Sequence, residues 1–186
     1  MNGKSENSLE DRDLAVRVLP YDGKAPLIFE QIRQFVRNVV PYPVEVEHIG
    51  STAVPGLGGK GIIDILTVTN RENMPKIVEI LESKGYKHNA QADTIPEKLF
   101  VSGPYKYNER ELHIHIHITF FGSKEHKDKL LFRDFLRRHP SEAETYFKLK
   151  QQASREAGSD GAKYTELKKS YINEVLETAR KEEEQM

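Results

Sequence analysis

One short stretch of the chain combines the residue types that bind phosphate with a carboxylate that can bind a metal ion. It begins with a turn-forming Gly50-Ser51-Thr52, and such small residues let backbone N–H groups and hydroxyls approach a phosphate closely. Lys60 follows, and Asp64 then lies in an apolar run, where an ionised carboxylate is costly unless a cation compensates it. Because a metal on a carboxylate neutralises charge on phosphate oxygens, this order of residues indicates nucleotide chemistry.

Each of these residues also has a structural interpretation. The turn lacks the Gly-Lys-Ser/Thr ending of a P-loop, so it can be an ordinary connection between strands. Asp64 can be a structural acid that pairs with Lys60 or with an arginine, and Lys60 can contact either a phosphate or that acid. The turn and the acid taken together favour the functional interpretation.

A second set of candidate ligands comes from the alternating segment 111–121. A spacing of two residues on a strand places His113, His115 and His117 on one face, roughly 7 Å apart between neighbours. Imidazole suits Zn²⁺ or Mn²⁺ better than Mg²⁺, so Asp64 with two of these rings can hold such an ion. We expect His115 or His117 to point at Asp64 as a metal ligand, a phosphate-binding cation or a general acid–base group. The alternative is a polar sheet face without a ligand.

Three other side chains are weaker candidates. His48 precedes the turn and can be a further metal ligand, or it can hydrogen-bond the turn itself. Arg133 and Arg137 are four residues apart on a predicted helix, share a face, and can clamp a phosphate bidentately. The alternative for the two arginines is a charged helix face on which they pair with Asp134 and with acids of the next helix.

Hydrophobic periodicity predicts the elements that must position these residues. We expect helices over 27–40, 73–84, 124–138, 141–157 and 162–181, and strands over 44–49, 62–68, 86–90, 98–102 and 111–121. Strands fill the first two thirds and helices the last third, which predicts an α/β (α+β) fold with a mixed sheet covered by helices. We expect one domain over 14–181, helical over 122–181, after a disordered tail at 1–13.

Composition narrows the classes of function. The 186 residues carry a formal charge of −1, so there is no overall attraction to nucleic acid or to anionic membranes. Without cysteine, disulfides and thiolate metal sites are excluded. The polar N-terminal segment lacks the apolar core of a secretory signal, and no apolar run approaches the roughly 20 residues that span a bilayer. The expected compartment is the cytoplasm.

The chain resembles the GrpB family, which is assigned to the nucleotidyltransferase superfamily. The resemblance covers about 16–171 and rests on several motifs: His48-Ile49-Gly50-Ser51-Thr52-Ala53-Val54-Pro55-Gly56-Leu57, Lys60, Ile62-Ile63-Asp64, the His-x-His strand, Phe132-Arg133-Asp134-Phe135-Leu136-Arg137 with His139-Pro140, and Pro20-Tyr21-Asp22. Tyr146, Lys150 and Lys163 also match the family pattern, and one of them is expected near the site.

The resemblance implies a polymerase-β-like core, that is, a mixed sheet of nucleotidyltransferase type. In that superfamily Gly50 and Ser51 would hold the phosphates of a nucleoside triphosphate, and Asp64 would be the first acid of an Asp-x-Asp/Glu pair. Leu66 stands at the position of the second acid, and the strand expected to supply a third acid is the one that carries histidines here. The usual two-magnesium site is therefore incomplete, and further ligands would have to come from histidines.

Three functions remain open. The first is a nucleotidyltransferase that uses a divalent metal (Mg²⁺, Mn²⁺ or Zn²⁺) and a nucleoside triphosphate. The second is a non-catalytic module that binds a nucleotide or phosphometabolite, which Leu66 favours over the first. The third is a His/Asp metal-dependent phosphoesterase. In each case the partner is a nucleotide or a phosphorylated small molecule, whereas a membrane is not expected and nucleic acid is disfavoured.

Overall fold

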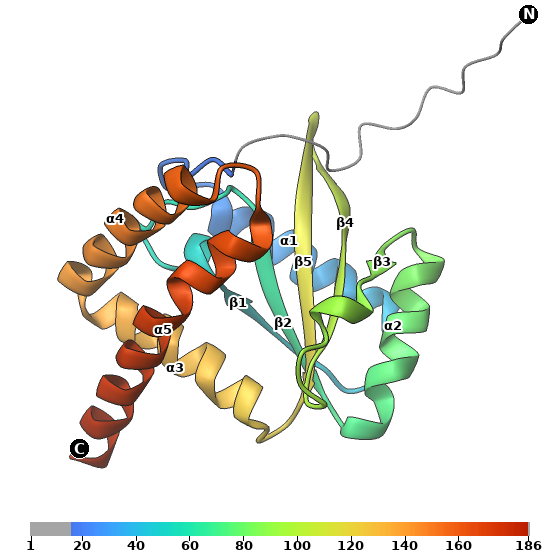
Figure 1. The fold of residues 1–186 in the computed structure, drawn as a ribbon. Coiled ribbons are helices and arrows are strands. Elements are labelled where there is room, and N and C mark those ends of the chain that lie inside the picture. Colours follow the sequence, from blue (N-terminus) through green and yellow to red (C-terminus); the bar gives the residue numbers. More distant parts are fainter. Residues whose placement is uncertain (1–15, 186) are drawn as a thin grey trace, which may run out of the picture.

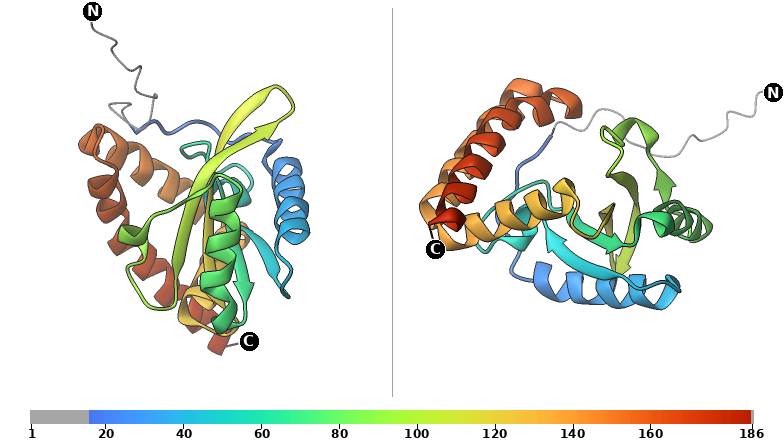
Figure 2. Two further views of the ribbon diagram at one scale, coloured as in Figure 1. Left: turned by 90° about the vertical axis from the view of Figure 1, so that its right-hand side faces the viewer. Right: turned by 90° about the horizontal axis from the view of Figure 1, so that it is seen from below.

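The computed structural model describes residues 16–185, which form a five-stranded mixed sheet between two groups of helices (Figure 1). Helices α1 (Ala25–Val39) and α2 (Met74–Ser83) pack on one face. Helices α3 (Lys124–Arg138), α4 (Pro140–Ala157) and α5 (Gly161–Glu184) form the C-terminal region on the other side, as the two views in Figure 2 show. The predicted mixed sheet covered by helices is confirmed; the predicted tail at 1–13 lies outside the described residues.

The strand order is β1-β2-β5-β4-β3. The strands are β1 (Glu45–Ile49), β2 (Ile63–Thr69), β3 (Lys87–His88), β4 (Leu99–Tyr107) and β5 (Arg110–Phe120). Only β2 and β5 run parallel; the other neighbouring pairs are antiparallel. Three 3₁₀ turns complete the fold: η1 (Ser51–Ala53), η2 (Arg71–Asn73) and η3 (Ala90–Ala92). The parallel pair places two strands that are far apart in sequence side by side.

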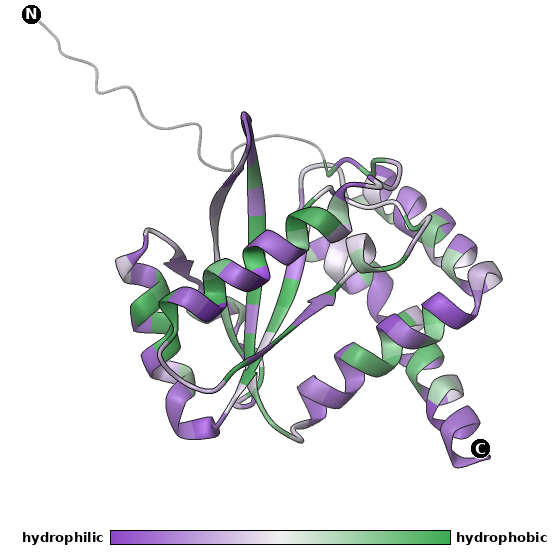
Figure 3. Ribbon diagram, turned by 180° about the vertical axis from the view of Figure 1, so that it is seen from behind, coloured by the Kyte–Doolittle hydropathy of each residue, from purple (hydrophilic) through white to green (hydrophobic). Residues whose placement is uncertain are grey.

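The apolar face of the two central strands forms the main core against α1 and α2. Alternation on β2 and β5 turns a set of isoleucines to this face, each at most 2% exposed: Ile63, Ile65, Ile114, Ile116 and Ile118. Helix α1 lies across this face, with its polar residues turned outward (Figure 3). The same alternation turns the remaining residues of β2 and β5 to the opposite face, toward the C-terminal helices.

On that opposite face, apolar and polar residues occupy different parts of β2. Leu66 and Val68 pack with Ile49 of β1 against Leu130 of α3. Asp64 lies at the start of the strand, opposite Ile49 in the register, and is only partly buried. The position expected for a second acid is therefore inside an apolar cluster, while the single acid lies next to the turn that follows β1.

Each predicted helix and strand is present, but two strands differ in length. The strand expected over 86–90 has two residues, and the strand expected over 98–102 extends to Tyr107. The longer strand includes Pro104, which lacks a backbone N–H. Beyond the short β3, however, β4 is an edge strand, where proline is tolerated because its missing N–H faces solvent. None of the helices between residues 16 and 185 combines the length and the apolar character that a membrane span requires.

Candidate metal and phosphate site

Asp64, His115 and His117 meet on the face of the sheet that the C-terminal helices cover. The parallel register pairs Asp64 with His115 and Leu66 with His117, so the three polar side chains project from adjacent strands on one face. Asp64 Oδ1 lies 3.0 Å from His115 Nδ1 and 3.7 Å from His117 Nε2. One ligand atom from each residue lies within 4.8 Å of the others. One carboxylate and two imidazoles can hold a divalent metal ion and leave coordination positions open.

The local electrostatics favour the protonation states that metal ligands need. Burial would raise the pKa of Asp64, but hydrogen bonding to His115 and His117 outweighs it and holds that pKa well below its usual value. Burial lowers the pKa of His117 to about 4, against the opposing effect of Asp64. The ring of Phe100 contacts both imidazoles edge to face, with centroids 5.0 and 5.1 Å away. Asp64 is thus ionised and His117 neutral near pH 7.

Gly50 brings the turn into contact with the carboxylate. Its φ is +71°, and a Cβ there would overlap Asp64 Oδ2 and lie 2.9 Å from Asp64 Cβ. The contact follows from the register, because Ile49, the residue before Gly50, pairs with Asp64. A side chain at this position would separate the turn from the acid, so the close approach requires glycine.

Ser51 is held from the C-terminal region by a buried lysine. Lys150 of α4 is 1% exposed, and its Nζ donates to Ser51 Oγ (2.9 Å) and to the carbonyl of Gly58. That Nζ also lies 4.9 Å from the ring centroid of Tyr146, one helical turn earlier. Burial and then repulsion from Lys168 lower the pKa of Lys150 to about 7, although Asp64 opposes the shift. Lys150 is thus positively charged only in part at neutral pH.

Lys168 of α5 and Lys60 complete a group that we call the lysine cluster: Lys60, Lys150 and Lys168. Lys168 and Lys60 place their Nζ atoms 3.9 and 5.7 Å from the ring centroid of Tyr164. Burial and then repulsion from Lys60 lower the pKa of Lys168 to about 8, against the attraction of Asp64. Among the described residues, none of the three lysines forms an ion pair with a carboxylate. Asp64 is the nearby negative charge that acts on Lys150 and Lys168.

Sequence reasoning identified part of this cluster. Lys60 was a candidate, and Tyr146 and Lys150 were expected on the family pattern, which also included Lys163. Lys163 instead donates to the backbone of Glu156 on the surface. Lys168 was missed. Its signal is the spacing Tyr164–Lys168, which repeats the spacing Tyr146–Lys150 and places a cation over an aromatic ring on each helix.

The structure does not bring His48 to the metal candidates. It points to the face opposite Asp64, because its neighbour Ile49 shares the face of that acid. There its ring stacks on Phe29 (centroids 4.6 Å apart), and Nε2 lies 3.0 Å from Thr52 Oγ1. Burial, with Arg137 nearby, lowers the pKa of His48 to about 4. His48 therefore hydrogen-bonds the turn from the face opposite Asp64, as the alternative to a metal ligand expected. This bond uses the hydroxyl group of Thr52.

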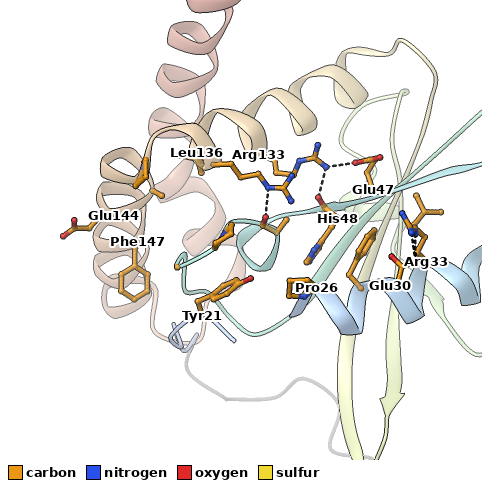
Figure 4. Close-up of a pocket in the computed structure, with 18 residues that line it drawn as sticks. Tyr21, Pro26, Glu30, Arg33, Glu47, His48, Arg133, Leu136, Glu144 and Phe147 are labelled. Atoms are coloured by element: carbon orange, nitrogen blue, oxygen red, sulfur yellow. Dashed lines mark hydrogen bonds and ion pairs between the residues drawn. The ribbon is translucent and has the colours of Figure 1, made fainter. Parts of the chain in front are cut away.

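Arg133 and Arg137 also lie away from Asp64. Arg133 donates to Glu47 (2.6 Å), to Asp134 (2.7 Å) and to the carbonyl of His48 (3.1 Å). Arg137 donates to the carbonyl of Ala53 (2.8 Å) and to Asp134 (3.3 Å). Both arginines thus pair with Asp134, as the alternative for this helix face expects, but the second acid is Glu47 of β1 and not an acid of the next helix. The two arginines line a separate pocket beside β1 (Figure 4).

Comparisons with known proteins agree on family and fold. A family model described as GrpB protein matches residues 15–178. A UPF0157 protein of Pseudomonas aeruginosa is 33% identical over 172 residues, 91% of this chain and 69% of that protein. The crystal structure of conserved protein GrpB from Enterococcus faecalis superposes with a TM-score of 0.74 and 28% identity, over 89% of this chain and 98% of that one.

More distant structures show the type of fold alone. The GLD-2/RNP-8 complex matches at a TM-score of 0.52 and 12% identity, over 74% of this chain and 56% of that one. Cid1 in complex with its short product ApU matches at 0.51 and 14%, over 74% of this chain and 43% of that one. The chain therefore has a nucleotidyltransferase-type fold.

Proposed function

The chain belongs to the GrpB family, and we propose that it binds a nucleoside triphosphate together with one divalent metal ion. The contact between Gly50 and the carboxylate of Asp64 carries this proposal. It joins a turn suited to phosphate directly to a metal-binding acid, so that one ion can contact both the acid and a phosphate held by the turn.

Asp64, His115 and His117 would hold the metal. Leu66 is fully buried in an apolar cluster with Ile49 and Val68, so no ligand for a second ion comes from that position. The donor set is rich in nitrogen, which favours Mn²⁺ or Zn²⁺ over Mg²⁺. When bound, such an ion would neutralise charge on phosphate oxygens.

The lysine cluster would hold the phosphates. In this site the cations outnumber Asp64, and Lys150 and Lys168 bind their protons weakly because they are buried near other cations. A polyphosphate would supply the missing negative charge and accept charge-assisted hydrogen bonds from the ammonium groups. Ser51, already bonded to Lys150, would complete the phosphate contacts.

The same donor set supports a second candidate function, single-metal hydrolysis of a phosphoester. One acid with two histidines resembles a hydrolytic metal centre more than the all-carboxylate two-metal site of nucleotidyl transfer. Binding of the triphosphate is common to the transferase and the binding module, so it is the step to test first.

Calorimetric titration of a non-hydrolysable ATP analogue tests the proposal, with Mn²⁺, Zn²⁺ or Mg²⁺ present. We expect metal-dependent binding that Asp64→Asn weakens about 100-fold, because the variant removes the anionic ligand. Asp128→Asn is the matched control, since Asp128 pairs with Lys124 and Arg180 on the outer helices. Equal affinity in Asp64→Asn and the unchanged chain would refute the metal-bridged mode.

Two activity assays on the same proteins then separate the possible reactions. Incorporation of labelled nucleotide into product, lost in Asp64→Asn, identifies a transferase. Metal-dependent release of nitrophenol from bis(p-nitrophenyl) phosphate identifies a phosphoesterase. Binding without either reaction identifies a binding module.

A further inference from the structure

A second pocket lies beside the edge strand β1, and we call it the arginine pocket. It has a volume of about 840 Å³ and lies between α1, β1, the loop after η1, α3 and α4 (Figure 4). The residues that matter below are Arg33, Arg133, Arg137, Phe29, His48 and Phe147. A volume of this size is in the range of pockets that enclose small organic ligands.

This pocket is distinct from the proposed metal and phosphate site. Neither the three metal candidates nor the lysine cluster lines it. The two sites meet at one loop instead: Gly50 and Ser51 face Asp64 and Lys150, whereas Ala53, Pro55 and Gly56 line the pocket. A ligand in this pocket would therefore be a second molecule, separate from one bound at Asp64.

The charges of the pocket are nearly balanced by internal pairs. Arg33 donates to Glu30 (2.5 Å), and Arg133 uses Glu47, Asp134 and a backbone carbonyl. Arg137 donates only two of its five N–H groups, to the carbonyl of Ala53 and to Asp134, and its side chain is 40% exposed. Arg137 can thus bind one more anionic group, and a single carboxylate or phosphate suits the balanced pocket better than a polyphosphate.

The rest of the lining suits a ring. Phe29 and the neutral ring of His48 form a parallel stack on one side, and Tyr21 and Phe147 contribute two more aromatic rings. Aromatic side chains bury flat apolar groups well and favour stacked or edge-on contacts with a ligand ring.

We propose that the arginine pocket binds a small ring-bearing molecule with one carboxylate or phosphate, its anionic group on Arg137, and that its occupancy tightens nucleotide binding. The two residues in contact with the ligand also hold the η1 turn: Arg137 bonds Ala53, and His48 bonds Thr52. A ligand that immobilises them keeps the turn in place for phosphate. This second part rests on the proposed function and is reciprocal by linkage.

The test is an NMR titration with 1-naphthoate as probe, because it has a fused ring and one carboxylate. 1-Naphthol, which lacks the anion, and inorganic phosphate, which lacks the ring, are the comparison compounds. We expect naphthoate to bind at least about tenfold more tightly than either compound. Amide shifts should centre on Ala53 and Arg137, and shifts centred on His115 would overturn the assignment.

Two variants and one control complete the test. Arg137→Met should weaken naphthoate binding at least about tenfold, by loss of a charge-assisted contact. Glu144 is an exposed residue of α4 among those that line the pocket; Glu144→Trp introduces a bulky ring there and should have the same effect with Arg137 intact. Arg138→Met, the exposed neighbour outside the pocket, should bind like the unchanged chain. Unaltered binding in both Arg137→Met and Glu144→Trp would refute the site.

The coupling has its own readout. The dissociation constant of the ATP analogue should fall about fivefold when naphthoate is saturating, and this change should vanish in Glu144→Trp. An unchanged dissociation constant for the ATP analogue would overturn the coupling but not the assignment of the pocket as a ligand site. If the analogue fails to bind without the probe, the proposed function fails, and the naphthoate titration still tests the pocket.

Discussion

The lysine cluster and the arginine pocket share one loop, yet they compensate their positive charges in different ways. Each arginine of the pocket has a carboxylate partner in the protein, such as Glu47 for Arg133 and Glu30 for Arg33. Among residues 16–185, the lysines near Asp64 have no carboxylate partner, and burial lowers the pKa of Lys150 to about 7 and that of Lys168 to about 8.

The difference indicates where an anionic ligand is needed. Arg133, which already bonds two carboxylates and a backbone carbonyl, stabilises the loop, whereas Arg137 keeps N–H groups for a single further anionic group. A buried ammonium without an acid partner is costly in the free protein, and a bound anion removes that cost. Sequence position alone assigns phosphates to both groups of cations. The ion pairs distinguish the two groups: the lysine cluster suits a polyphosphate, and the arginine pocket suits a single anionic group.

Gly50→Ala is expected to have the largest effect on stability, because the missing side chain of Gly50 lets the turn approach the Asp64 side chain closely. The added Cβ overlaps the carboxylate of Asp64 at a positive φ, which should lower the free energy of unfolding by about 4 kcal/mol. Gly56→Ala is the matched control, since Gly56 has φ +80° and nothing within 4 Å. Urea denaturation should give Gly50→Ala a loss at least about 2 kcal/mol larger than that of Gly56→Ala. Equal losses would show that strain at φ, and not contact with Asp64, requires this glycine.

Lys150→Met tests the lysine cluster, the region whose cations are not paired with carboxylates among the described residues. Losing the ammonium group should weaken binding of the ATP analogue by about 2–3 kcal/mol, or roughly 100-fold. The free energy of unfolding should change by less than about 1 kcal/mol, because the lost hydrogen bonds are offset by removal of a buried charge. Lys148→Met is the control, since Lys148 is exposed on the same helix and pairs with Glu144. Unweakened binding in Lys150→Met would remove the lysine cluster from the phosphate site.

Arg133→Met tests the arginine pocket, whose cations are paired with carboxylates, and should lower stability while leaving nucleotide binding nearly unchanged. The variant leaves Glu47 and Asp134 without their partner, which should lower the free energy of unfolding by about 2 kcal/mol in thermal or urea denaturation. Binding of the ATP analogue should stay within about twofold of the unchanged chain, because Arg133 does not contact the turn at Gly50 and Ser51. A tenfold loss of affinity with normal stability would reverse the assignment of the two regions.

The smallest effect is a pair of opposite pH trends. The pKa of Lys150 is about 7 in the folded chain, against 10.5 as its ordinary value, so the unfolded chain binds more protons between these two pH values. Stability from this group therefore rises as pH rises through that window. Binding of a polyphosphate needs the protonated amines and should weaken about tenfold between pH 7 and pH 9.

The pH trends are measured by urea denaturation and by calorimetry in the same buffers. Lys150→Met should flatten both slopes, and Lys148→Met should leave them unchanged. Affinity that is independent of pH in the unchanged chain would exclude Lys150 and Lys168 as phosphate-binding groups.

Local pattern was enough to predict most of the fold. Alternation along 111–121 predicted the strand β5 and the shared face of its histidines, and the periodicity of the C-terminal third predicted α3 to α5. Local pattern failed where the neighbours of a strand decide its length. β4 continues through Pro104 because β3 begins only at Lys87, opposite Ser102, and leaves the rest of β4 as an edge; no property of residues 98–107 alone shows that.

The candidate site was predictable only in part, for a related reason. Asp64 and the turn lie close in sequence, and the histidine strand was a sound expectation as its neighbour. Lys168 was missed, and the sequence left the role of Arg133 open between a phosphate clamp and ion pairing, because the partners are remote: Arg133 meets Glu47 across 86 residues. Charges on a helix face look alike in sequence whether a carboxylate from another element reaches them or not.

The order of residues alone shows which chemical groups are available: one acid before a leucine where a second acid is expected, a glycine-serine turn, and three alternating histidines. Which of these groups come into contact depends on the packing of the strands and helices. The parallel pairing of β2 with β5 places His115 beside Asp64, and strand alternation turns His48 to the other face. The packing of α4 and α5 brings unpaired lysines to the turn, because burial and charge pairing depend on contacts between distant segments, which no local pattern contains.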